Sequence, residues 1–219
     1  MAFQGWPEAA LDFYDGLEED NSKSYWTAHK AIYEKAVLGP MIDLTAELGE
    51  DFGEDFGETK IFRPNRDIRF SADKSPYKTA IGAIIGSVYV QFSASGLAAG
   101  NGMYQLASDQ LARFRQAVHE DLTGHELERI IKAITSHGIS LRGADVLKTV
   151  PRGFPADHPR VELLRYKGLA AWREWSVEPW LSTAAAKDRI AEFLVTTRPL
   201  AEWLAAHVGP SQLPEAKRR

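Results

Sequence analysis

Residues 80–107 read AIGAIIGSVYVQFSASGLAAGNGMYQLA, and they contain three short segments with the two-residue period of β-strands. These segments are Ala80–Gly86, Val88–Ser93 and Gly102–Ala107. The glycine-rich residues Ser95–Gly102 are expected to form a loop with several turns before the last strand. The pattern therefore predicts an antiparallel meander.

Helical patterns precede and follow this meander. On the N-terminal side they cover residues 7–20 and Lys23–Leu38, with a restart at Pro40. On the C-terminal side they begin at Asp109, at Thr123 or Gly124, near Arg160 and at Thr183, with a break at Pro199. We therefore predict an α+β fold, a single domain over residues 1–210 in which an antiparallel sheet packs against N- and C-terminal helices. A basic tail, residues 211–219, is expected to be disordered.

Composition excludes several classes of protein. The 219 residues are 44% hydrophobic and 26% charged, which is typical of a globular chain rather than a disordered one. The absence of cysteine excludes disulfides, thiolate nucleophiles and cysteine-ligated metals. No secretory signal is visible, and the longest apolar stretch, Ala80–Phe92, is too short to span a membrane. A soluble, cytoplasmic protein without membrane partners is expected.

Charge is distributed unevenly along the chain. Residues 1–58 contain 14 acidic residues and three lysines, a formal charge of −11. Two segments carry +4 each: residues 60–78, the first cationic block, and residues 142–173, the second cationic block. The whole chain has a formal charge of −4. Either the blocks pair with carboxylates of the chain, or they converge on an anionic ligand.

The first cationic block has three arginines at three-residue spacing, Arg63, Arg66 and Arg69, followed by Lys74 and Lys78. Guanidinium groups at this density repel one another unless anions neutralise them, and their forks match phosphate and carboxylate oxygens. The alternative is that Asp67, Asp73 and the acidic N-terminal helices neutralise them as structural ion pairs. The sequence leaves both interpretations open.

The second cationic block supplies Lys148, Arg152, Arg165 and Lys167, and it also contains Asp157 and His158. Asp157 could orient His158 as an acid or base, or the two could form a turn with a capping aspartate. The candidate proton carriers are Asp67, Asp73 and His158. No metal site is predicted, because the histidines lack the spacing of a ligand set.

The run FRPNRDIRFSADKSPYKTAIGA, residues 62–83, closely resembles the signature of the domain-of-unknown-function 2461 family. The blocks NSKSYWTAHK (21–30), GNGMY (100–104), residues 111–115 and LKTVPRGFPADHPRVELLRYKGL (147–169) fit the same family. Ser24 and Tyr25 stand where an acidic residue and a tryptophan-like residue are more usual. The resemblance covers roughly residues 3–205, which is nearly the whole chain and the usual length of one domain. It implies a single-domain unit and no particular reaction.

The leading functional hypothesis is a pocket for a phosphate- or carboxylate-bearing small molecule, and it leaves open whether the protein is an enzyme. The ligand-binding residues would be Arg63, Arg66, Arg69, Lys74, Lys78, Arg152, Arg165 and Lys167. The alternative is a non-enzymatic binding or scaffold module for an acidic protein or a nucleic acid. An isoelectric point near 5.9 disfavours nucleic acid. A magnesium ion accompanying a phosphate would leave no sequence signature, so the cofactor stays unknown.

Overall fold

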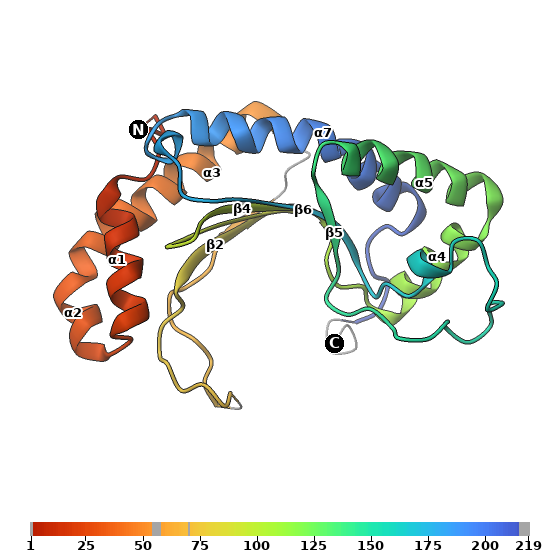
Figure 1. Cartoon of the computed structure of the whole chain (residues 1–219), viewed down its shortest axis with the longest axis horizontal. Coiled ribbons are helices and arrows are strands. Elements are labelled where there is room, and N and C mark those ends of the chain that lie inside the picture. The colour runs from red at the N-terminus through yellow and green to blue at the C-terminus, as the bar shows by residue number, and fades with distance from the viewer. Residues whose placement is uncertain (1, 54–57, 70, 215–219) are drawn as a thin grey trace. The chain divides into compact units, whose positions relative to one another are not determined.

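The structure is a computed structural model that describes residues 2–53, 58–69 and 71–214. It combines helices with one six-stranded sheet in the order β1-β2-β3-β4-β6-β5 (Figure 1). The strands are β1 (Thr59–Ile61), β2 (Ala80–Ile85), β3 (Val88–Ser93), β4 (Gly96–Met103), β5 (Ser140–Arg142) and β6 (Leu169–Trp175). The predicted α+β fold, with an antiparallel meander and helices at both ends of the chain, is confirmed.

The chain divides into two compact units. The first unit takes in residues 1–99 and 174–193, and the second takes in residues 100–173 and 194–219. Strands β4 and β6 and the helix α7 (Ala185–His207) each have residues in both units. The predicted single domain over residues 1–210 stays a prediction.

The first unit begins with a nearly continuous series of helices: α1 (Glu8–Glu19), α2 (Lys23–Ile32), the π-helical turn η1 (Tyr33–Leu38) and α3 (Gly39–Phe52). Ser22 caps α2 by accepting a hydrogen bond from the backbone N–H of Tyr25 at 3.1 Å. A proline collides with the carbonyl four residues before it in a regular α-helix. The wider π-turn accommodates Pro40, and the N–H of Gly39 reaches back five residues to the carbonyl of Glu34.

The core of the first unit forms where these helices meet one face of β2 and β3. The two strands pair antiparallel with Ile81 opposite Phe92 and Ile85 opposite Val88. All four of these side chains are buried. The ring of Trp6 stacks on Phe92 with a centroid separation of 4.6 Å, so aromatic packing joins the N-terminus to the sheet. The short 3-10 helix η3 (Pro179–Ser182) also belongs to this unit.

The second unit contains α4 (Ser108–His119), α5 (Asp121–Ser136) and the four-residue helix α6 (Val161–Leu164), together with β5. Its core includes Phe114, Leu127 and Ile134, which are buried side chains of α4 and α5. No described helix is both long enough and apolar enough to cross a membrane.

The structure differs from the sequence-based prediction at three elements. Residues 95–102, predicted as a loop, largely form β4, and β6 was not predicted at all. The glycines allow close approach of backbone: a Cβ on Gly102, where φ is +132°, would lie 2.7 Å from the carbonyl oxygen of Leu169. Helix α7 continues through Pro199, because its neighbours Thr197 and Leu200 are fully buried and their packing offsets the lost backbone hydrogen bond.

Candidate functional site

Residues 62–79 form a long hairpin between β1 and β2, which we call the finger. Its two arms are joined by backbone hydrogen bonds from Arg66 to Pro76 at 2.9 Å and from Lys78 to Pro64 at 2.8 Å. Figure 1 shows it in yellow, projecting beyond the end of β2. The alternation of apolar and polar residues in Ile68–Phe70 also predicts a short extended segment, but Phe70 lies outside the described residues. The finger has five arginines and lysines and two aspartates.

The base of the finger is clamped to the turn between α1 and α2. The side-chain amide of Asn21 donates to the carbonyl of Tyr77 at 3.1 Å and accepts from its N–H at 3.0 Å. The Tyr77 ring is buried and stacks on Trp26 at 4.4 Å with an interplanar angle of 9°. Because both backbone groups and the ring of one residue are held, the base of the finger is fixed relative to the helices.

Ion pairs within the finger engage both of its carboxylates. Arg66 pairs with Asp73, and Arg69 donates to Asp67 at 2.9 and 2.6 Å. Hydrogen bonds from Ser75 and then from Arg66 lower the pKa of Asp73, and those from Arg69 lower the pKa of Asp67. Carboxyl groups with lowered pKa values stay ionised near neutral pH, which makes them poor proton carriers.

Arg63 and Lys78 form a different environment near the base of the finger. The ammonium of Lys78 donates to the backbone carbonyl of Arg63 at 2.9 Å and lies 5.3 Å from the centre of the Phe62 ring. Burial and then the charge of Arg63 lower the pKa of Lys78. Among the described residues, 2–53, 58–69 and 71–214, neither Arg63 nor Lys78 forms an ion pair with a carboxylate. The two cations therefore repel each other without a carboxylate ion pair to either, although the charge of Arg63 reaches Asp67 and helps to lower its pKa.

The remaining lysine of the finger and the second cationic block complete the predicted set. Lys74 donates to the carbonyl of Ile68 at 3.0 Å. Arg165 is paired with Glu162 at 2.8 Å, and Lys167 is paired with Asp145. Lys148 and Arg152 are exposed. The first block lies in the first unit and the second block in the second, and the predicted convergence of the two blocks stays a prediction.

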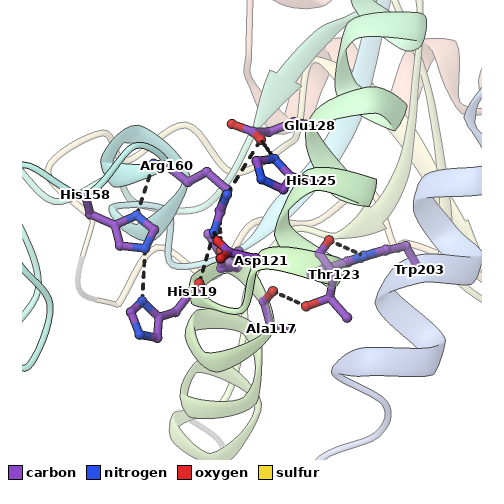
Figure 2. A network of polar contacts seen from close by, with 10 residues as sticks. Ala117, His119, Asp121, Thr123, His125, Glu128, His158, Arg160 and Trp203 are labelled. Atoms are coloured by element: carbon purple, nitrogen blue, oxygen red, sulfur yellow. Dashed lines mark hydrogen bonds and ion pairs between the residues drawn. The ribbon is translucent and has the colours of Figure 1, made fainter.

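His158 is buried and is held through both ring nitrogens (Figure 2). Its Nδ1 accepts the backbone N–H of Arg160 at 3.0 Å, and its Nε2 lies 2.9 Å from Nδ1 of His119. Since Nδ1 of His158 is an acceptor, the neutral ring carries its proton on Nε2 and donates it to His119. The groups that orient His158 are thus Arg160 and His119 rather than the predicted Asp157.

The sequence identified Arg160 only as one of the cations of the second block. In the structure it is the most deeply buried charged side chain of the network drawn in Figure 2. Its side chain is 1% exposed. Nε donates to the carbonyl of Val118 at 2.7 Å, and Nη2 donates to the carbonyl of His119 at 3.0 Å and to Asp121 at 2.9 Å. It thereby satisfies carbonyls at the C-terminal end of α4 (Figure 2). Gly124 makes room for it, since a Cβ there would lie 2.4 Å from Nε.

Arg160 therefore has a structural role, because its hydrogen bonds join the end of α4 to the start of α5. The sequence placed Gly124 at the start of a helix, but α5 begins at Asp121, so Gly124 lies inside the helix, where a glycine indicates close packing. The described residues hold no group of three or more histidine, aspartate or glutamate side chains suited to a metal ion.

Together these observations define an α+β protein with a clamped, exposed cationic hairpin. The chain matches the model of the family described as conserved hypothetical protein (DUF2461) over residues 9–203, and it belongs to this family. The family predicted from residues 62–83 is confirmed. No curated protein and no solved structure matches the chain.

Proposed function

We propose that this protein binds carboxylate or phosphate groups of a partner through the finger, as a binding module rather than an enzyme. The observation that carries the proposal is the pair Arg63 and Lys78, whose charges repel each other and neither of which forms an ion pair with a described carboxylate, since Asp67 and Asp73 pair with Arg69 and Arg66. An oxyanion near both would remove that repulsion and would accept hydrogen bonds from both cations.

The cations further along the finger are available to such a ligand as well. The pair Arg69–Asp67 is largely open to water, with the arginine side chain 76% exposed and the aspartate 49% exposed. Exposed ion pairs contribute little to stability, so Arg69 can exchange its internal partner for an external carboxylate at small cost. The clamp at Asn21 keeps the cations presented without a large loss of entropy on binding.

Geometry favours an acidic polypeptide over a small molecule as the source of the oxyanion. The candidate residues lie on a projecting hairpin, where Arg63, Arg69 and Lys74 are all exposed. The three candidate proton carriers are already engaged, Asp67 and Asp73 by arginines and His158 by His119. These contacts support binding over catalysis, and the overall charge of −4 disfavours nucleic acid.

The test is fluorescence anisotropy with a labelled glutamate oligopeptide at low salt. Reversing one charge turns an attraction of about 1 kcal/mol at 4 Å in water into a repulsion of similar size. We expect Arg63→Glu to weaken binding about tenfold or more. Arg152→Glu is the matched control, because it changes an exposed arginine of the second block and leaves the finger intact.

Competition experiments identify the source of the oxyanion. Displacement of the peptide by phosphate or citrate at low concentration would indicate a small-molecule site. Displacement by single-stranded DNA with a steep salt dependence would indicate nucleic acid. Equal losses in Arg63→Glu and Arg152→Glu, or no binding of any oxyanion by the unaltered protein, would overturn the proposal.

A further inference from the structure

We infer that the partner of the finger is the acidic face of α1 in a second copy of this chain. The inference rests on the proposed function, since it assumes that the finger binds carboxylates. It is carried by complementary charge: the same unit presents a projecting cationic hairpin and a helix whose solvent face is acidic, and each lacks full compensation.

The face of α1 is an uninterrupted row of carboxylates. Glu8, Asp12, Asp15 and Glu19 follow one another at spacings of four, three and four residues, which places them on one side of the helix. All four are exposed, as are Glu18 and Asp20. Helix α1 contains no lysine or arginine. Among the described side chains, none forms an ion pair with these carboxylates.

This arrangement is costly for an isolated helix. Like charges three and four residues apart repel each other. Acidic side chains at the C-terminal end of a helix, here Glu18 and Glu19, also oppose the helix dipole. The negative field reaches neighbouring groups: after burial, the charges of Asp20 and Glu19 are the largest causes that raise the pKa of Tyr25. A cationic partner on this face would relieve all three effects.

The finger does not compensate this face within its own chain. Its ion pairs are internal, Arg66 with Asp73 and Arg69 with Asp67, although the finger and α1 belong to the same unit and are joined through Asn21. Asp73 and Asp67 thus pair with Arg66 and Arg69, whereas the described part of the chain contains no ion pair from the finger to α1.

A two-fold dimer satisfies both surfaces at once. In such an interface the finger of each copy meets α1 of the other, so that each contact occurs twice. Because the contact is built from exposed charges, its strength falls as salt screens them. Complementary charge of this kind gives selectivity for the partner and fast association.

The experiment is sedimentation velocity of the full chain at about 0.01 M and about 1 M salt, between which the Debye length falls from about 30 to about 3 Å. We expect a dimer at low salt and a monomer at high salt. Two charge-reversed variants remove one side each: Arg63→Glu with Lys74→Glu on the finger, and Asp12→Lys with Asp15→Lys on α1. Each variant alone is expected to be monomeric at low salt.

Mixing the two variants is the decisive arm. In the mixture one contact is the original pairing and the other is the same pairing with both charges reversed, so both attract and a heterodimer is expected. The matched controls are Arg152→Glu and Glu202→Lys, exposed residues outside the finger and α1, and both should dimerise like the unaltered chain.

The outcomes separate this inference from the proposed function. A monomer at every salt concentration that still binds the glutamate oligopeptide through Arg63 would overturn the second copy as partner and leave anion binding intact. A salt-sensitive dimer that persists in both variants would overturn the assigned surfaces. A monomer that binds no oxyanion would overturn both proposals.

Discussion

Replacing Arg160 with methionine tests whether one guanidinium holds the corner between α4 and α5. Methionine keeps an unbranched stem of similar length and removes every donor. The substitution leaves the carbonyls of Val118 and His119 without the bonds that now reach them at 2.7 and 3.0 Å. Asp121 loses its partner too, but its side chain is 87% exposed and returns to water.

The expected loss follows from these contacts. A buried acceptor without a donor costs about 1–3 kcal/mol, and His119 is exposed enough for its carbonyl to regain water more readily than that of Val118. The methionine stem recovers part of the apolar packing. We therefore expect Arg160→Met to lower the free energy of unfolding by about 2–4 kcal/mol. For a chain of this size that corresponds to a fall in Tm of roughly 4–16 °C.

Urea denaturation followed by far-UV circular dichroism measures the change, with Asp121→Asn as the control. The control removes the exposed ion pair and keeps the hydrogen bonds from Arg160 to the two carbonyls, so its free energy of unfolding should be close to that of the unaltered protein. A loss below about 1 kcal/mol in Arg160→Met would refute the reasoning, because one orphaned carbonyl alone should cost that much. An equal loss in Asp121→Asn would show that the ion pair, rather than the helix carbonyls, gives Arg160 its role.

Three further predictions follow from single contacts. Gly124→Ala should destabilise the protein, since the added Cβ would lie 2.4 Å from Nε of Arg160 and 2.5 Å from a helix carbonyl; a melting temperature equal to that of the unaltered protein would contradict this. Asn21→Ala should release the base of the finger and raise hydrogen exchange there, with exchange in α5 unchanged as the control. Asp109 has its pKa lowered to about 2, chiefly by the backbone N–H of Gln212. Because the folded-state pKa is the lower one, its contribution is present above about pH 4 and is lost as the pH falls toward 2. Asp109→Asn should make the acid side of a Tm–pH curve less steep, and an unchanged slope would contradict this.

The elements that the sequence predicted correctly are those with one buried face. Helix α1 places Ala10, Phe13, Tyr14 and Leu17 in the core at helical spacing, and its acidic residues face outward, so its pattern is amphipathic. Strands β2 and β3 have a buried face against the helices. In such elements the alternation of apolar and polar side chains along the sequence is enough to tell a helix from a strand.

The elements that escaped prediction have no such contrast. Six consecutive residues of β4, from Gly96 to Asn101, are buried, and three of these six are glycine or asparagine, which are typical of turns. A strand enclosed on both faces has no alternation to detect. Strand β6 contains Trp172 and Trp175, whose three-residue spacing also fits a helix, so the correct period was ambiguous.

The arginines were the hardest part of the site to interpret from sequence, because their roles depend on what the fold places opposite them. Arg66 pairs with Asp73, seven residues further along the hairpin, and Arg69 pairs with Asp67, two residues before it, whereas Arg63, at the same spacing, forms no ion pair with a described carboxylate. Arg160 is enclosed because α5 has a glycine where another residue would have a Cβ. Spacing along the chain identifies a cluster of charge, but the acceptors that the fold places beside each guanidinium determine whether it stabilises the fold or remains available to a ligand.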